Sequence, residues 1–304
     1  EGIKDKKIDD FIEGLKDARD TEVFKECKTW LLDHADLFEH VTKEDIEAIP
    51  SEICNSITLS TMHGCPPQEI ENIVMYLLKE KHINTYVKCN PTLLGYEFVR
   101  KAMDDLGYDY MAFTDFHFKD DLQYEDAVPM LKRLKETAAQ EGLSFGVKLT
   151  NTFPVDVTRN ELPSEEMYMS GKSLCALSLS VAHKLSKAFD GKLRISYSGG
   201  ADAFNIDKIF GLGIWPITVA TTLLKPGGYN RGIQLADKLN AMEFKPFEGV
   251  DVDGLAALIE EIKHDPHHVK PVKPLPSRKM DKEVPLLDCF TAPCMEGCPI
   301  HQDI

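Results

Sequence analysis

Three cysteines lie within ten residues of one another near the end of the chain: Cys289, Cys294 and Cys298. Their spacing is Cys-x4-Cys-x3-Cys, and a proline follows the last one. Soft thiolates grouped so closely are typical of an iron–sulphur cluster, whereas zinc sites more often use Cys-x2-Cys pairs. The alternative is three free thiols in a disordered tail. We favour cluster ligands and expect the fourth ligand to come from elsewhere, so that a cluster binds only in a longer chain.

A fourth cysteine, Cys65, is a candidate catalytic group. It lies between the β-rich run 57–61 and a helix that begins with prolines. A helix N-terminus lowers the pKa of a thiol, which predicts a reactive cysteine, and a buried structural cysteine is the alternative. His63 and His117 could act as acid–base groups or metal ligands, although isolated loop histidines usually do neither.

Two turns after predicted strands carry small or hydroxyl side chains that leave backbone amides accessible. They are Ser198-Gly199-Gly200 and Thr221-Thr222, with Lys225 beyond the second. Glycine allows a ligand to approach the backbone closely, and successive N–H groups can cradle an anion. These turns are therefore candidate phosphate sites, with ordinary strand–helix turns as the alternative.

Lys88 and Lys148 each lie inside a strand pattern. A lysine is costly to bury unless it meets an anion or a carbonyl group, so each is a candidate ligand contact. The alternative is that each side chain leaves the strand end for solvent. Asp115 and Asp156, which follow strand ends, are candidate substrate contacts.

The elements that must position these residues alternate regularly. Strands are expected at 57–61, 85–89, 110–113, 145–149, 193–197 and 217–220, and helices at 67–78, 96–106, 127–141, 171–189, 202–212 and 232–242. Strict β–α alternation predicts a parallel sheet with crossover helices, and the nearly continuous apolar strands suit a sheet covered on both faces.

A barrel is favoured over a doubly wound sheet. No Gly-x-Gly-x-x-Gly turn follows the first strand, and the segment 87–92 is echoed sixty residues on at 147–152. Repetition of one strand-end chemistry suits a barrel, where all strand carboxyl ends face one site. The fold class is therefore α/β, a TIM-barrel-like (β/α)8 fold. Six strands do not close such a barrel, so either two strands precede residue 1 or the barrel is incomplete.

The chain divides into five segments by composition. They are a helical segment of the barrel (1–55), the parallel β/α portion (56–245), a trailing helix (246–264), a Pro-rich linker (265–285) and the start of an iron–sulphur module (286–304). Both ends look cut, which predicts a piece of a longer polypeptide.

The net charge and the hydropathy of the chain argue against some classes of binding partner. The chain has 35 Lys+Arg against 50 Asp+Glu, a net charge of −15, which argues against nucleic acid or an anionic membrane as partner. No apolar run could span a bilayer, and the N-terminus has no features of a secretory signal. We expect a cytoplasmic protein.

Two stretches carry a resemblance to known families. The residues around Cys289, Cys294 and Cys298 resemble the opening of the iron–sulphur, NAD(P)H-dependent module shared by the glutamate synthase small subunit and dihydropyrimidine dehydrogenase, with Leu286 in place of a further cysteine. The segments 148–152, 197–202 and 218–224 resemble strand ends of the flavin barrels of dihydroorotate and dihydropyrimidine dehydrogenases. Segment 60–69 is most similar to the selenate reductase iron–sulphur subunit family, which joins such a barrel to such a module.

The resemblance implies an oxidoreductase in which electrons pass from NAD(P)H to a conjugated heterocycle or an oxyanion. NAD(P)H and FAD would bind in downstream modules of the same polypeptide. FMN would bind the barrel, with Cys65 as general acid, and with these contacts: Lys88 or Lys148, Asn151, Thr152, Gly199, Gly200, Thr221 and Thr222. The alternative is a non-catalytic barrel that docks a partner oxidoreductase subunit.

Overall fold

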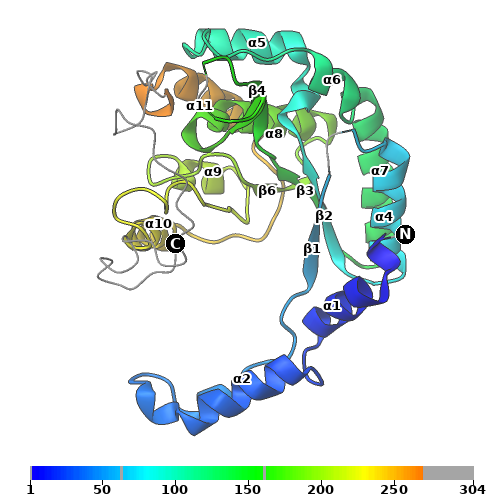
Figure 1. The fold of residues 1–304 in the computed structure, drawn as a ribbon, viewed down its shortest axis with the longest axis vertical. Helices are drawn as coiled ribbons and strands as arrows, with labels where there is room; N and C mark the ends of the chain where they lie inside the picture. Colours follow the sequence, from blue (N-terminus) through cyan, green and yellow to red (C-terminus); the bar gives the residue numbers. More distant parts are fainter. Residues whose placement is uncertain (1, 62–63, 160–161, 270–304) are drawn as a thin grey trace.

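The computed structural model describes residues 2–61, 64–159 and 162–269. Its centre is a parallel sheet of β1 (Ser56–Ser60), β2 (Asn84–Cys89), β3 (Phe145–Leu149) and β6 (Arg194–Tyr197) (Figure 1). The strands lie in the order β1-β2-β3-β6, and every pairing is parallel. Ile217 extends this wall by a single parallel bridge to Tyr197. Order along the sheet thus follows order along the chain, as in a barrel wall, whereas a doubly wound sheet reverses its order.

Helices follow the strands, and those at residues 67–79, 124–140 and 175–188 pack directly against the wall. The helices are α4 (Pro67–Lys79), α5 (Tyr96–Asp105), α6 (Phe116–Asp120), α7 (Tyr124–Gln140), α8 (Cys175–Ala188), α9 (Ile206–Gly211), α10 (Asn230–Asn240) and α11 (Val252–His264). Short 3₁₀ turns include η3 (Pro91–Leu94), η4 (Gly171–Leu174) and η5 (Pro266–His268), and β4 (Phe153–Asp156) pairs antiparallel with β5 (Glu166–Met169).

The core lies between the strands and these helices. In α4, the side chains at helical spacing on one stripe, Ile70, Val74 and Leu77, are buried, as is typical of an amphipathic helix. The strand residues Val87, Val147 and Ile195 belong to the same apolar core as Ile70 and Val74 and have no exposed surface. This apolar layer fixes which face of each strand is turned outward, because a shift of one residue would expose it.

The inner face carries the complementary residues of each strand. Register aligns Ser60 with Lys88, Lys88 with Lys148, and Lys148 with Ser196, so these four side chains form one row on the inner face. Two residues earlier on the same strands, Tyr86 lies over Gly146, where an added Cβ would meet the tyrosine ring at 2.6 Å.

Arg194 continues this second row and is enclosed by aromatic rings. Its guanidinium lies 5.2 Å from the ring centre of Trp215 and 4.6 Å from that of Phe247. Tyr86 and Arg194 therefore fill the amino-terminal end of the inner face, while its carboxyl end holds the lysine row.

The N-terminal helices form an arm, residues 2–55, that comprises α1 (Lys6–Lys16), α2 (Glu22–Asp33) and α3 (Lys43–Glu47). α1 is anchored to the body, because Lys81 pairs with Asp9 and Glu13, and Ile12 packs against Leu77. α2 extends away from the barrel wall (Figure 1).

Two predicted strands are wrong. Residues 110–113 form no strand, because their carbonyl groups bond elsewhere: Met111 O accepts from Arg100, and Ala112 O accepts from the amide of Asp156. The strand predicted at 217–220 is reduced to the bridge at Ile217, since the ladder to β6 ends with the bond from Thr218 N to Tyr197 O and the chain then turns away. α6 and the β4–β5 hairpin were not predicted.

Candidate functional site

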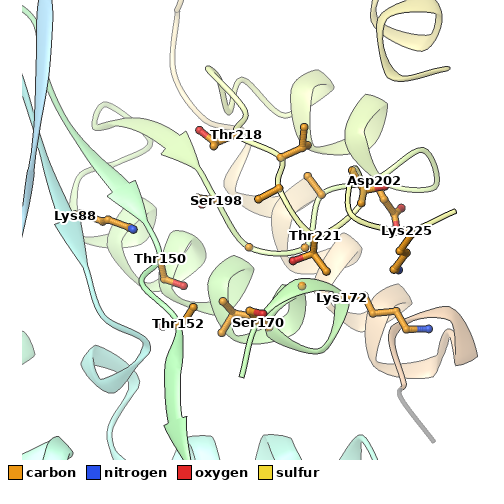
Figure 2. Close-up of a pocket in the computed structure, with 18 residues that line it drawn as sticks. Lys88, Thr150, Thr152, Ser170, Lys172, Ser198, Asp202, Thr218, Thr221 and Lys225 are labelled. Atoms are coloured by element: carbon orange, nitrogen blue, oxygen red, sulfur yellow. The ribbon is translucent and has the colours of Figure 1, made fainter. Parts of the chain in front are cut away.

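A cavity of about 140 Å³ lies at the carboxyl ends of β3 and β6 (Figure 2). Its walls come from the segments that follow these strands, from η4, and from the residues after Ile217. The side chains and turns that line it include Lys88, Thr150, Thr152, Ser170, Lys172, Ser198, Gly199, Gly200, Asp202, Thr218, Thr221, Thr222 and Lys225. Carboxyl ends of parallel strands are where barrel enzymes place their active sites.

The Gly199-Gly200 turn is held by its packing. Gly200 has φ +75°, and a Cβ there would collide with the carbonyl group of Gly171. A Cβ at Gly199 would collide with the side chain of Ser178 on α8. The buried hydroxyl of Tyr197 donates to Gly199 O at 2.7 Å. Both glycines are thus required by the close approach of β6 to the η4–α8 segment.

This packing leaves backbone donors on the cavity wall. The N–H groups of Gly199, Gly200, Thr221 and Thr222 donate to no acceptor within the part of the chain that the structure describes. Unpaired amides beside a glycine of positive φ form the kind of concavity that binds an anion. The two turns that were predicted to bind a phosphate therefore line the same cavity.

Three lysines, Lys88, Lys172 and Lys225, add positive charge to the walls. Figure 2 draws Lys88 on one side of the cavity and the other two on the opposite side. None of the three ammonium groups has a hydrogen bond or ion pair to any described residue. Against them stands one carboxylate among the lining residues described, Asp202. The protein has a net charge of −15, but the excess of lysines over carboxylates at these walls makes the local electrostatic potential favourable for an anion.

Lys148 lies next to Lys88 in the inner-face row but does not line the cavity. Its Nζ donates to Thr218 Oγ1 at 2.8 Å. Burial lowers the pKa of Lys88, and burial together with the charge of Lys88 lowers that of Lys148. The lowered pKa values mean that the charged forms of both lysines are disfavoured. An anion or an electron-rich group on this face would stabilise those charged forms.

A second cluster of polar side chains lies at the ends of β1, β2 and β3, and its members hydrogen-bond to one another. Asp121 accepts from Asn90 at 3.0 Å and from Thr92 at 2.7 Å, and Asn151 Nδ2 donates to Asn90 Oδ1 at 2.6 Å. The amide of Gly64 adds a bond to Asp121 at 3.3 Å. Asn151 therefore points into this network, whereas its neighbour Thr152 lines the cavity.

Cys65 lies beside this network, in a crevice that also contains Cys89 and Asn90. Its pKa is raised, first by burial and then by the carboxylate of Glu69. The lowering expected from the helix N-terminus is not found, because burial, and after it the carboxylate of Glu69 in the first turn of α4, raises the pKa instead. The thiol holds its proton at neutral pH.

The remaining candidates lie away from the cavity. His117 Nε2 contacts Glu166 Oε1 at 2.7 Å, and Asp115 pairs with Lys119 at 2.5 Å. Asp156 ends β4 and does not line the cavity. Four candidates fall outside the described residues: His63, Cys289, Cys294 and Cys298.

Several lining residues were missed by sequence reasoning, notably Ser170, Lys172 and Asp202. The signal for the first two is a Ser-Gly-Lys turn before α8, whose glycine, Gly171, has φ +72°. Among the residues described, no group of three His, Cys, Asp or Glu side chains could hold a metal ion. No helix in the same ranges is long and apolar enough to cross a membrane.

Comparison with known proteins gives close relatives. A protein of Escherichia coli strain K12 named "Putative oxidoreductase YgfK" is 44% identical over 315 aligned residues, which take in 100% of this chain and 30% of the relative. Its counterpart in Escherichia coli O157:H7 gives the same values. The chain thus spans about 30% of the length of these relatives.

Among solved structures, ligand-free DHODH from Eimeria tenella matches 60% of this chain and 60% of its own, with 16% identity and a TM-score of 0.32. That score is too low to support an inference.

The family described as "Oxidoreductase YgfK, N-terminal TIM-barrel domain" matches residues 1–270. This match confirms the predicted TIM-barrel class, and the sheet described above supplies part of such a barrel. The predicted oxidoreductase relationship is confirmed as well. By its sequence and its fold, the chain belongs to the YgfK N-terminal TIM-barrel family of oxidoreductases.

Proposed function

We propose that this barrel binds FMN and acts as the flavin-binding part of a longer iron–sulphur oxidoreductase. The observation that carries the proposal is the cavity at β3 and β6, where amides and lysines without a partner among the described residues surround one space of about 140 Å³. A neutral ligand would gain little from such walls, whereas a phosphate dianion would pair with them.

The residues present suit the phosphate end of the nucleotide. The amides of Gly199, Gly200 and Thr221 would hold the phosphate oxygens, with Lys172 and Lys225 nearby. A cavity of about 140 Å³ is smaller than the roughly 300–1,000 Å³ of whole-ligand sites. The ring would therefore lie outside it, along the inner-face row that holds Lys88 and Lys148.

The chain's own groups supply charge and a proton. When bound, flavin accepts and returns electrons or hydride, and its reduced ring carries negative charge. Lys88 and Lys148 offer cations on the face where that charge would develop. Cys65 holds a proton on Sγ and is our candidate for the general acid, a role in which a raised pKa keeps the thiol protonated.

The electron route is proposed from the resemblance of the sequence. Electrons would come from NAD(P)H through FAD and an iron–sulphur cluster in downstream domains, with Cys289, Cys294 and Cys298 as cluster ligands. The acceptor would be a conjugated heterocycle or an oxyanion such as selenate. We place this chemistry in the cytoplasm.

A second candidate function is docking of a partner oxidoreductase subunit by a barrel without flavin. The arm formed by residues 2–55 favours it, because it exposes large apolar side chains: Phe11 (64%), Val23 (69%), Trp30 (51%) and Leu37 (67%). Apolar surface of this kind marks contact with another protein surface.

A matched pair of ligands separates the two functions. FMN and riboflavin differ only by the phosphate, so titration of each into the purified chain, followed by flavin fluorescence, isolates the phosphate contribution. We expect FMN to bind at least tenfold more tightly. Equal affinities would remove the phosphate assignment, and binding of neither would favour the docking function.

A further inference from the structure

Asp202 is an unexpected residue for an anion site. Asp202 is buried, with 7% of the residue exposed, and it lines the cavity together with the amides and lysines that have no partner among the described residues. A buried carboxylate facing a phosphate would repel it. In the structure, both carboxylate oxygens of Asp202 already take part in a hydrogen bond, which limits how far they can turn toward a ligand.

One oxygen is held within the turn and the other from a distant segment. Oδ1 accepts from the amide of Phe204 at 2.9 Å. Oδ2 lies 2.6 Å from His267 Nε2, which must donate, because a carboxylate only accepts. His267 is 65 residues further along the chain, in the segment Asp265–Val269 that follows α11, here termed the strap.

The strap is held in place by contacts on both sides of His267. The ring of His267 lies 4.4 Å from that of Phe204, and its amide donates to Asp265 Oδ1 at 2.9 Å. His268 is 2% exposed, and its carbonyl oxygen accepts from Tyr108 at 2.9 Å. The imidazole therefore reaches Asp202 from a fixed backbone.

We propose that His267 is a positioning residue that holds the Asp202 carboxylate away from the bound anion. This inference rests on the proposed phosphate site. With His267 in place, Oδ2 is directed to the strap and Lys225 and Lys172 remain available to the ligand. Without it, Oδ2 would be an unpaired buried acceptor that either faces the anion or pairs with one of those lysines. Both outcomes weaken anion binding.

The same contact couples the cavity to the strap. If the docked strap favours anion binding, the bound anion must favour the docked strap by the same factor. The amides of His268 and Val269, which bond to Asp265 O at 3.1 Å and Pro266 O at 3.2 Å, report whether the strap is docked. Occupancy of the cavity would thus stabilise the segment from which the chain continues toward its cysteine cluster.

A double-mutant cycle tests the positioning role. Affinities for inorganic phosphate and FMN are measured by calorimetry and fluorescence on the intact chain and on H267A, H267Q, D202N and D202N/H267A. We expect H267A to bind both ligands about tenfold more weakly, and H267Q, which keeps a donor, to stay within about threefold of the unaltered chain. D202N/H267A should regain affinity, because the carboxylate charge is gone. An H267A protein that binds normally, or a double variant as weak as H267A, would overturn the proposal.

Hydrogen exchange gives a readout that does not require a variant to fold. Saturating phosphate should slow exchange at His268 and Val269 several-fold in the unaltered chain, and unchanged exchange on full binding contradicts the coupling. The proposed function fails separately: if the unaltered chain binds neither phosphate nor FMN, the site itself is wrong. Normal binding with no effect of H267A removes the role of His267 alone.

Discussion

Two groups of polar residues lie at the same edge of the sheet and differ in how far they satisfy themselves. At β1, β2 and β3, Asp121, Asn90 and Asn151 bond to one another and to the loop before α4. At β3 and β6, the turn amides and three lysines of the cavity have no partner among the residues described. The first group is complete as it stands, whereas the second calls for a ligand.

The contrast shows how a structural polar residue differs from a binding one. Buried polar groups are almost always hydrogen-bonded, so a satisfied network is explained by the fold alone. The amides and lysines of the cavity lack such partners among the described residues and are all hydrogen-bond donors, so an anionic ligand would satisfy them together. By this criterion we assign Asn151 to the network, and Lys172 joins Lys88 and Lys225 at the candidate site.

The largest effect should come from the satisfied network. D121A would leave the amide of Asn90, the hydroxyl of Thr92 and the amide of Gly64 without their acceptor. Each unsatisfied buried donor costs about 1–3 kcal/mol, so we expect the free energy of unfolding to fall by about 3 kcal/mol. Urea denaturation measures it, with D115A, an exposed carboxylate, as the control. A loss below about 1 kcal/mol for D121A would show that the network is not complete.

A smaller effect, on binding rather than stability, is expected at the cavity. K88M removes a half-buried cation of lowered pKa from the wall, so it should weaken inorganic phosphate binding about tenfold, or about 1.4 kcal/mol. Unfolding should change little, since the ammonium has no described partner to lose. Calorimetry measures the affinity, and K187M, a lysine remote from this cavity, is the matched control. Stronger destabilisation than loss of binding would place Lys88 with the structural group.

The smallest effect should be at Cys65, which lies beside the satisfied network. Burial and Glu69 raise the pKa of its thiol, so the thiolate fraction at pH 8 is lower than that of an ordinary cysteine. E69Q removes the carboxylate that disfavours the thiolate, and alkylation by iodoacetamide should become about threefold faster. C65A identifies the signal of this residue by mass spectrometry. A rate that is unchanged in E69Q would leave burial as the sole cause.

Sequence reasoning captured the barrel class because periodicity reports which faces are buried. Four of the six predicted strands and the helices that cover them are present, since their apolar residues pack on one another. The strand at 110–113 failed because an apolar run shows burial but not pairing. Phe113 is buried against Phe153, 5.0 Å between ring centres, without any ladder.

Some residues of the candidate site could also be predicted from the sequence, and others could not. The glycine turn stands out because positive φ demands glycine, and Lys88 stands out because a strand seldom buries a cation. The partnership of Asp202 with His267 spans 65 residues and depends on where α11 ends. No local pattern carries that information. The opposite fates of Asn151 and Thr152, adjacent in sequence, likewise follow from tertiary contacts.

Gly146 determines which side chains can occupy the inner face of the sheet. Because this strand position has no side chain, the ring of Tyr86 can lie over it, and beside it the guanidinium of Arg194 contacts the rings of Trp215 and Phe247. Bulky side chains therefore occupy the amino-terminal end of the inner face, two residues before the row that holds Lys88 and Lys148. A side chain at residue 146 would collide with the ring of Tyr86, so a single glycine decides how this end of the inner face is filled.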